Sequence, residues 1–496
     1  MDYSGIKVLV MGLGLHGGGL ETARFLLRRG AEVTVTDLRD EKTLRPAIEQ
    51  LDAACGELGR EKVRYVLGRH DIEDFQKAGM VIKNPGVKPD SPFLQAAKRI
   101  ETDISLFLAE SPARLFAVTG SKGKSCTASA LHRILDRAHH SAAQPDLKRP
   151  GGRSFLGGNI TVSPLTFLDD LTENDDVVLE LSSWQLGDLK GRAAGDGSPL
   201  LKPSAAILTA IMPDHLDRYA SMEEYVDDKR NIYRGQDSTC VTVAGEDEWG
   251  KSFRAETKGR PLVYSRSPLP EGQSGGWIDS NGAGLARLWD WPGAEETAEL
   301  VPSRLLTPGD HQKLNLLASA LAAYSLGVRA EKIHEALAAF PGIEHRLELF
   351  HETKEARFYN DSAATVPEAA AACIEALTSQ GPLVLVTGGT DKNLDFSPLA
   401  SAAGKADSIV LLAGSGCEKL SHLLDKAGVA YSGPFDDLEK AVNRALEAVS
   451  KLKNTAHGPV IVALSPGCAS FGMFLNEFDR GRKWKDAVRG KLGVRS

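Results

Sequence analysis

The stretch Leu115-Phe-Ala-Val-Thr-Gly120-Ser-Lys-Gly-Lys-Ser125 decides the fold of this chain. Residues 115–119 are a short apolar run typical of a buried strand, and the glycine-rich turn after it opens a helix. In such a unit the loop N–H groups and the helix amino terminus bind phosphate, a lysine neutralises charge and a hydroxyl ligates magnesium. The stretch therefore predicts an α/β nucleotide-binding domain.

The candidate phosphate-binding residues are consecutive positions of this loop. The loop has the short form GxxGKS, because Val118 stands where the general GxxxxGK[ST] loop has its first glycine. A glycine-rich turn without a ligand is the alternative, but the strand, the lysine and the serine all favour phosphate binding. The positions are Gly120, Ser121, Lys122, Gly123, Lys124 and Ser125.

Short apolar runs alternate with helical patterns on both sides of this unit, which predicts parallel sheets covered by helices on both faces. The fold class expected is α/β. Expected strands are 7–11, 31–36, 80–83, 115–119, 176–181, 205–211, 383–387, 408–413 and 460–464, and expected helices include 21–29, 225–233 and 311–326.

A length of 496 residues predicts roughly three domains at about 150 residues each. Ser111-Pro112 and the turn at Phe340-Pro341-Gly342 are candidate boundaries, which gives domains 1–112, 113–343 and 344–496. Two stretches, 187–203 and 271–284, are rich in turn residues, and the second contains the hairpin signal Asn281-Gly282. Both are expected to be surface insertions.

The composition excludes several classes of protein. With 42% hydrophobic residues, 25% charged residues and a net charge of −7, the chain is globular and lacks the basic footprint of a nucleic-acid or membrane-surface binder. The 6 cysteines are scattered without metal-type spacing, which favours reduced thiols in a cytoplasmic protein. No apolar stretch reaches the ~18 residues of a membrane span.

Acidic residues follow two of the expected strands. Glu180 ends an apolar run, and Asp214-His215-Leu216-Asp217-Arg218 crowds a later loop. Carboxylates and an imidazole near a phosphate loop could hold magnesium or accept a proton. An acid that reaches solvent and a loop hydrogen bond between His215 and an aspartate are the simpler alternatives.

The amino terminus carries Gly12-x-Gly14-x-x-Gly17, with Asp37 after the second expected strand. This pattern matches the dinucleotide fingerprint and makes a nicotinamide dehydrogenase a competing hypothesis. A nucleotide diphosphate fits the same loop, and the dehydrogenase hypothesis leaves the GKS loop without a role. A non-catalytic nucleotide-binding module is the third possibility.

An ordered series of motifs resembles the Mur ligases across nearly the whole chain. The motifs are GLGLHG, NPG at Asn84, TGSKGKS, GGN ending at Asn159, LELSSWQL, DHLDRY, Lys229, EHR ending at Arg346, NDSAAT from Asn360 and LSPGCASF from Leu464. The resemblance implies a Rossmann-like amino-terminal domain for a UDP-sugar, a central P-loop ATPase and a Rossmann-like carboxyl-terminal domain for an amino acid. It also implies ATP and Mg²⁺ as cofactors.

The implied activity is ATP-dependent addition of D-glutamate to UDP-N-acetylmuramoyl-L-alanine through an acyl phosphate, in peptidoglycan precursor synthesis. The catalytic residues implied are Lys124, Glu180, His215 and Lys229, with Lys229 carbamylated. Magnesium would be held by Ser125, Glu180, His215 and Lys229. ATP would also meet Cys126, Gln312, Asn315, Arg346 and Asp361. The substrates would contact Leu15, Asp37, Leu38, Arg39, Asn84, Pro85, Gly86, Asn159, Ser182, Gln185, Thr365, Lys392, Ser470 and Phe478.

The sequence departs from the family pattern in the stretch Ala363-Ala364-Thr365-Val366, where related ligases usually have Lys-Ala-Thr-Asn. This removes one cation and one amide near the amino-acid end. A sibling ligase that adds L-glutamate or another amino acid, including a folylpolyglutamate type, therefore stays the alternative. The expected protein is a cytoplasmic monomer whose partners are these substrates and no nucleic acid.

Overall fold

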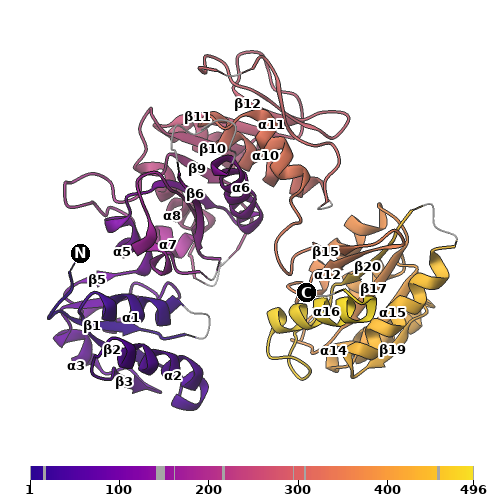
Figure 1. Cartoon of the computed structure of the whole chain (residues 1–496), viewed down its shortest axis with the longest axis horizontal. Coiled ribbons are helices and arrows are strands. Elements are labelled where there is room, and N and C mark those ends of the chain that lie inside the picture. The colour runs from indigo at the N-terminus through magenta and orange to yellow at the C-terminus, as the bar shows by residue number, and fades with distance from the viewer. Residues whose placement is uncertain are drawn as a thin grey trace. The chain divides into compact units, whose positions relative to one another are not determined.

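The structure, a computed structural model, describes residues 2–14, 18–140, 151–160, 162–214, 218–293, 295–306, 309–454 and 458–494. These residues form three sheets with helices packed against them, which confirms the α/β class (Figure 1). The chain divides into two compact units. The first contains the first two sheets and the second contains the third sheet. Their bounds are Met1–Ser303 with Lys313–Leu337, and Arg304–Gln312 with Ala338–Ser496.

The first sheet has five parallel strands in the order β3-β2-β1-β4-β5. The chain order reverses between β1 and β4, and in open α/β sheets ligands bind where the loops after such strands diverge. The glycine-rich loop that begins at Gly12 follows β1, and the turn at Asn84 follows β4. The elements are β1 (Lys7–Met11), α1 (Gly18–Arg28), β2 (Glu32–Asp37), α2 (Glu41–Glu57), β3 (Arg64–Leu67), α3 (Ile72–Lys77), β4 (Met80–Ile82), α4 (Pro92–Gln95), β5 (Ile100–Glu101) and α5 (Asp103–Glu110).

The second sheet has nine strands in the order β14-β13-β12-β11-β10-β9-β6-β8-β7, and β6 lies between β9 and β8. Its strands are β6 (Arg114–Thr119), β7 (Ser154–Gly158), β8 (Asp176–Glu180), β9 (Ala205–Leu208), β10 (Val241–Gly245), β11 (Arg260–Ser265), β12 (Gly275–Ile278), β13 (Gly284–Arg287) and β14 (Ala298–Val301). The helical segments are α6 (Lys124–His139), η1 (Pro164–Thr166), η2 (Leu168–Asp170), α7 (Ser183–Asp188), α8 (Met222–Arg234), α9 (Glu248–Glu256), α10 (Asp310–Ser325) and α11 (Ala330–Ala338).

The third sheet has six strands in the order β15-β16-β20-β17-β18-β19, with β15 antiparallel to β16 and the other pairs parallel. Its strands are β15 (Glu348–Glu352), β16 (Ala356–Asn360), β17 (Leu383–Gly388), β18 (Ser408–Leu412), β19 (Ser432–Phe435) and β20 (Val460–Leu464). Its helices are α12 (Pro367–Thr378), α13 (Ser397–Ala403), α14 (Ser415–Ala427), α15 (Leu438–Leu452) and α16 (Glu477–Leu492).

The central strands are buried along their whole length, which explains why they are continuous apolar runs rather than alternating ones. All residues of β8, β10, β17 and β20 are buried. In the first unit one hydrophobic core includes side chains from both sheets. In the second unit two separate cores lie against the third sheet.

Two expectations about individual segments are wrong. The stretch 271–284 is not a surface insertion, because it supplies β12, which pairs with β11 in parallel and with β13 through the Asn281-Gly282 turn. The sheet is therefore mixed at this edge. The strand expected at 205–211 ends at Leu208, because the next residue, Thr209, turns to bond the carbonyl of Thr119 through both its N–H and its hydroxyl.

None of the described helices is long and apolar enough to cross a membrane. All six cysteines lie in the described part of the chain, where each is buried and none is in a disulfide.

Candidate active site

The loop after β6 has a backbone that only glycine can supply. A Cβ on Gly120 would lie 1.9 Å from Thr209 Oγ1, and the φ of Gly120 is +146°. Gly123 has φ +93°, and a Cβ there would lie 2.4 Å from Asn315 Oδ1 of α10. Because both glycines let the chain turn tightly, α6 begins directly at Lys124 and its amino terminus opens onto the loop.

Lys124 bends back over the loop that precedes it. Its Nζ lies 3.1 Å from the carbonyl oxygens of both Gly120 and Ser121. The Ser121 hydroxyl is buried between Met212 and Tyr225, which marks it as a structural part of the loop. Lys122 lies on the outside, with Nζ 3.8 Å from Asp214. Cys126, the next position after Ser125, is buried in α6.

Glu180 is a buried carboxylate at the end of β8, only 1% exposed. Its Oε1 accepts a hydrogen bond of 2.8 Å from Asn159 Nδ2, whereas its Oε2 is buried without a hydrogen-bond partner among the described residues. A buried carboxylate oxygen without a partner is costly. The parallel registry of β6 and β8 places Glu180 opposite Val118, directly before the phosphate loop. The geometry fits a cation ligand.

Lys229 is buried on α8, with 1% of the residue exposed. Its Nζ donates to Gly120 O at 2.9 Å and lies 4.4 Å from the centre of the Tyr225 ring. Burial, and then the charge of nearby Lys124, lower the pKa of Lys229 to about 7. A lysine on a polar helix is usually solvated, so the burial of Lys229 is a tertiary finding.

Two of the expected site residues, Leu15 and His215, lie outside the described residues. Their neighbours are placed. Asp214 contacts the phosphate loop through Lys122, and Arg218 donates to the carbonyl oxygens of Gly86 and Val87 at 3.0 and 3.3 Å. The described residues of the loop after β9 therefore contact both the phosphate loop and the turn that follows β4.

A cavity of about 370 Å³ lies beside the glycine-rich loop in the first unit. It is lined by the loop glycines and by expected substrate-binding residues that come from both sheets, namely Arg39, Asn84, Pro85, Asn159 and Gln185. Asn84 Oδ1 accepts the N–H of Gly86 at 2.9 Å and so shapes the turn. The structure therefore brings together side chains that the sequence separates by about a hundred residues.

Two other residues expected at this end, Asp37 and Leu38, lie next to each other at the end of β2. Asp37 Oδ2 accepts the N–H groups of Leu13 and Gly14 at 3.0 and 3.3 Å, and its Oδ1 accepts the N–H of Arg39. Asp37 therefore braces the start of the glycine-rich loop, and it is not among the residues that line the cavity. Leu38, next to it, is 67% exposed.

Ser182 and Gln185 cap the amino terminus of α7. The Ser182 hydroxyl accepts the N–H of Gln185, and Gln185 Oε1 accepts the N–H of Ser182 at 3.0 Å. This reciprocal arrangement is a capping box, which satisfies two N–H groups of the helix end. Gln185 nevertheless also lines the cavity.

The residues expected near adenine and ribose lie on separate elements. Gln312 and Asn315 are in the first two turns of α10, and Asn315 lies against Gly123 of the phosphate loop. In the second unit Arg346 is exposed, whereas Asp361 is 7% exposed and accepts the N–H of Leu347 and the hydroxyl of Ser465. Burial raises the pKa of Asp361 to about 6.

The four residues expected at the amino-acid end follow strands of the third sheet or begin α16. Thr365 and Phe478 are partly buried, Ser470 is buried, and Lys392 is exposed. The loop after β17 meets the loop after β20, because Thr390 and Ala469 form an isolated bridge. Phe478 packs against His345, with ring centres 5.5 Å apart.

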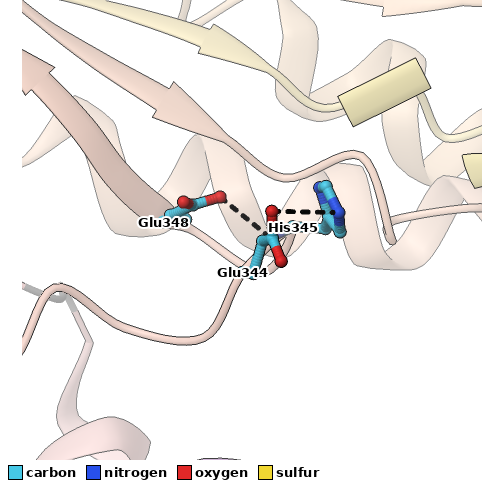
Figure 2. A group of neighbouring side chains, drawn as sticks. All are labelled: Glu344, His345 and Glu348. Carbon is cyan, nitrogen blue, oxygen red and sulfur yellow. Dashed lines mark hydrogen bonds and ion pairs between the residues drawn. The ribbon is translucent and has the colours of Figure 1, made fainter. Parts of the chain in front are cut away.

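Glu344, His345 and Glu348 form a compact group in the second unit (Figure 2). This group is an ion-pair network rather than a metal centre. Lys485 Nζ lies 2.7 Å from Glu344 and 3.0 Å from Glu348, where it already supplies the positive charge. Asn360 Nδ2 donates to His345 Nδ1 at 2.8 Å, which occupies the lone pair of that nitrogen.

Sequence reasoning missed several buried charges. Arg480, 1% exposed, donates to the hydroxyl and the carbonyl of Ser362 and to Cys468 O, and burial lowers its pKa to about 10. Lys83 pairs with Asp188 across the first unit. The burial of Lys83 could have been suspected from its position, because it is a single charged residue between the apolar strand β4 and the turn at Asn84.

Family models match most of the chain in three consecutive stretches. Residues 6–105 match the Mur ligase MurD-like N-terminal domain, residues 118–323 the Mur ligase middle domain, and residues 345–461 the Mur ligase glutamate ligase domain. The chain belongs to the Mur ligase family. This confirms the resemblance and the three-domain α/β architecture expected from the sequence.

Relatives of this Mur ligase match it over nearly their full length. A Treponema pallidum (strain Nichols) protein named UDP-N-acetylmuramoylalanine--D-glutamate ligase is 39% identical, with 98% of each chain covered. Proteins of the same name from Roseiflexus sp. (strain RS-1) and Borreliella afzelii (strain PKo) are 38% and 35% identical, each over 98% of this chain and 99% and 98% of their own.

Solved structures of Mur ligases share the fold. UDP-N-acetylmuramate-alanine ligase MurC from Thermotoga maritima matches with a TM-score of 0.55 at 19% identity, over 98% of this chain and 100% of that one. MurF ligase from Thermotoga maritima, in complex with ADP, matches with a TM-score of 0.52 at 18% identity, over 99% and 96%. At these identities the likeness concerns the fold alone.

Proposed function

We propose that this chain is the Mur ligase that joins D-glutamate to UDP-N-acetylmuramoyl-L-alanine while it cleaves ATP. The observation that carries the proposal is the match of 39% identity over 98% of both chains to a relative with that name. The phosphate loop, the buried Glu180 and the buried Lys229 lie together in the first unit, as ATP-dependent ligation requires. The dehydrogenase hypothesis gains no comparable support.

The phosphate loop would bind ATP through its own backbone. The N–H groups at the amino terminus of α6 point into the loop, where the helix dipole favours a phosphate. We infer that Lys124 then exchanges its contacts with the carbonyls of Gly120 and Ser121 for phosphate oxygens, because an ammonium gains more from an anion than from a carbonyl. Asn315 and Gln312 would face the adenine.

Magnesium fits the residues beside this loop. The buried Oε2 of Glu180 lacks a hydrogen-bond partner in the described structure, and Ser125 offers a hydroxyl at the start of α6. Oxygen ligands of this kind suit Mg²⁺. When bound, Mg²⁺ would neutralise charge on the phosphates. We propose Ser125, Glu180, His215 and Lys229 as the residues that hold it.

Lys229 would become an oxygen ligand by carbamylation. Only an uncharged amine adds to carbon dioxide, and the product is a carbamate anion with release of one proton. A pKa of about 7 leaves roughly half of the amine uncharged at neutral pH, whereas a lysine with the ordinary pKa of 10.5 would be almost entirely protonated. The buried position of Lys229 thus favours the modification that the family resemblance implies.

The cavity of the first unit would take the UDP-sugar. Leu15, Asp37, Leu38, Arg39, Asn84, Pro85, Gly86, Asn159, Ser182 and Gln185 are the proposed contacts, and several of them line the cavity. Asn159 has a particular place there, because its backbone and side chain both bond Glu180. It would therefore link substrate binding to the carboxylate that we assign to magnesium.

The second unit would bind the incoming amino acid. Lys392 is exposed on the loop after β17 and could pair with the side-chain carboxylate of glutamate. Thr365, Ser470 and Phe478 would contact the remainder, while Arg346 and Asp361 would serve the ribose or phosphates. For Asp361 this needs the 345–347 turn to change, because its carboxylate now bonds Leu347 and Ser465.

The reaction couples two substitutions. The L-alanyl carboxylate of the UDP-sugar attacks the terminal phosphate of ATP, which gives an acyl phosphate and ADP. The glutamate amine then attacks the acyl carbon and loses a proton, and inorganic phosphate leaves. The residues of the chain bind and orient these groups, with Lys124 placed where charge develops.

The remaining parts of the proposal concern organisation. We assign residues 1–112 to UDP-sugar binding, 113–343 to ATP binding and 344–496 to amino-acid binding, in a cytoplasmic monomer. The three family matches at 6–105, 118–323 and 345–461 support the division of the chain into three stretches.

One experiment tests the function directly. The protein is incubated with ATP, magnesium, UDP-N-acetylmuramoyl-L-alanine and either D- or L-glutamate, and the UDP-sugar product is weighed by mass spectrometry. We expect a mass gain of one glutamyl residue with D-glutamate and none with L-glutamate. A gain with L-glutamate alone, or ADP release without any gain, would refute the proposal.

A further inference from the structure

The segment 187–203, for which the sequence offers no role, folds back onto the first sheet. Arg192 lies in this segment, and its guanidinium makes three contacts at once. Its Nε donates to Asp188 O at 2.8 Å, its Nη2 donates to Ile100 O at 2.8 Å, and its Nη1 forms an ion pair with Glu101. Ile100 and Glu101 are the whole of strand β5. The guanidinium therefore attaches the end of α7 to the edge of the first sheet.

A second contact lies beside the first. Asp188, the last residue of α7, accepts from Lys83 Nζ at 2.6 Å, and the two side chains are 10% and 3% exposed. The backbone N–H of Lys83 donates to the carbonyl oxygen of Glu101. The Lys83–Asp188 pair and the Arg192–Glu101 pair therefore hold two residues that are hydrogen-bonded to each other. Lys83 is also the residue directly before Asn84-Pro85-Gly86, the turn that lines the cavity.

The turn is held from a third side by Arg218. Its guanidinium stacks on Trp184 of α7 at 4.2 Å and donates to the carbonyl oxygens of Gly86 and Val87. Arg218, which bonds the turn, and Asp188 and Arg192, which hold Lys83 and β5 beside it, all belong to helices and loops of the second sheet, whereas the turn belongs to the first. The position of the turn in the cavity is therefore set by residues of the other sheet.

The energetics of the buried pair argue for a positioning role. Desolvation is the largest influence on both partners, lowering the pKa of Lys83 and raising the pKa of Asp188. A buried ion pair of this kind contributes little net stability compared with apolar residues of similar volume, but it fixes one geometry. A contact that costs desolvation and lies beside a binding turn is better explained by position than by stability.

We propose that Asp188 and Arg192 are positioning residues for the UDP-sugar, and that segment 187–203 is a strap that holds the Asn84-Pro85-Gly86 turn in its binding position. This proposal rests on the assignment of the cavity to the UDP-sugar. The strap does not touch the phosphate loop or the second unit in any contact described above. Its effect should therefore appear in the affinity for the UDP-sugar and not in the handling of ATP or glutamate.

The test uses the full-length protein and the variants Asp188→Asn and Arg192→Gln. We expect the KM and the calorimetric Kd for UDP-N-acetylmuramoyl-L-alanine to rise by at least about tenfold, while kcat and the KM values for ATP and glutamate stay within about twofold. Lys190→Gln is the matched control, because Lys190 lies in the same segment but pairs with Asp227 of α8 at 2.8 Å. It should leave all constants unchanged.

A second variant guards against simple misfolding, since Asp188→Asn leaves Lys83 buried without its partner. Lys83→Met with Asp188→Leu replaces both charges by apolar groups, which should preserve folding while the turn is no longer fixed. This double variant should have a lower affinity for the UDP-sugar and an unchanged melting temperature. Separately, Arg192→Lys should bind the UDP-sugar more tightly than Arg192→Gln does.

The outcomes separate the strap from the site. The strap proposal is overturned if Asp188→Asn, Arg192→Gln and the double variant bind the UDP-sugar like wild type, or if all kinetic constants change together. Arg39→Ala and Asn159→Ala report on the cavity itself. If these two also bind the UDP-sugar normally, the cavity assignment fails. If they lose affinity while the strap variants do not, the strap alone fails.

Discussion

Glu180 shows how one unpaired atom points to a ligand. Its Oε1 is satisfied by Asn159, whereas the buried Oε2 has no hydrogen-bond partner among the residues described. A folded protein tolerates such an atom where something outside the chain completes it. We therefore expect Glu180 to hold a ligand through Oε2 while its Oε1 keeps the bond to Asn159.

The change Glu180→Gln separates these two roles. The amide oxygen can still accept from Asn159, so the free energy of unfolding should stay the same or rise. Turnover should fall by about a hundredfold or more, and half-maximal activity should need about tenfold more magnesium. ADP release over a magnesium titration measures both effects. Glu248→Gln, an exposed acid paired with Lys251, is the control, and equal activity of both variants would contradict the prediction.

Lys229 carries a prediction about pH. Its pKa of about 7 when folded lies below the ordinary lysine value of 10.5. Between these values the unfolded chain binds a proton that the folded chain does not, so the free energy of unfolding should rise with pH across this window and level off below 7, where both states bind the proton. The slope for one group is at most about 1.4 kcal/mol per pH unit.

The measurement compares wild type with Lys229→Met by denaturant unfolding at several pH values between 7 and 10, in buffer free of carbon dioxide. Because other titrating groups are common to both proteins, the difference in unfolding free energy isolates Lys229. We expect the unfolding free energy of wild type to rise relative to that of Lys229→Met as the pH rises. Parallel curves would mean that Lys229 titrates normally and is not poised for carbamylation.

At the scale of elements, the site is built from loops at the carboxyl ends of parallel strands. The phosphate loop follows β6, Glu180 ends β8, and Asp214 lies on the loop after β9, and these three strands are neighbours in the sheet. Their shared direction brings the loops to one edge. The loop after β6 can approach the loop after β9 closely because Gly120 has no side chain. A Cβ at this position would clash with Thr209.

Gly120→Ala tests this approach. The added methyl group has no room and the φ of +146° strains any residue with a side chain, so the loop must move. We expect a loss of about 1–3 kcal/mol of stability and at least a tenfold rise in the Kd for ATP. Thermal unfolding and calorimetric ATP titration measure the two effects. Gly195→Ala, in open space at a surface turn, should match wild type, and an equally neutral Gly120→Ala would contradict the role of the loop.

At the scale of the whole molecule, the chain consists of two compact units with separate hydrophobic cores. Units with their own cores can unfold independently. The cavity assigned to the UDP-sugar is lined entirely by residues of the first unit.

Scanning calorimetry should therefore show two unfolding transitions. A ligand stabilises the state that binds it. At a hundredfold excess over its Kd, UDP-N-acetylmuramoyl-L-alanine should therefore stabilise the first unit by about 2.7 kcal/mol and raise its transition temperature, while the transition temperature of the second unit stays the same. Asn159→Ala identifies the transition by removing the shift. A single transition, or an equal shift of both, would contradict this division of binding.

Much of the architecture was predictable because it depends on residues close together in the chain. The run 7–11 and the run 460–464 appear as β1 and β20 with the expected bounds, since continuous apolar runs between turn residues suit buried parallel strands. The stretch 271–284 was misjudged, because its turn residues are local while its pairing with β11 is not.

The sequence by itself determined the three-part α/β fold, the glycine-rich turn between β6 and α6 and membership of the Mur ligase family, because ordered local motifs carry that information. Only the tertiary structure decided that Lys229 is buried, that one oxygen of Glu180 lacks a partner, and that Arg192 holds β5. Burial and long-range pairing depend on segments that meet only after folding, so no spacing along the chain could predict them.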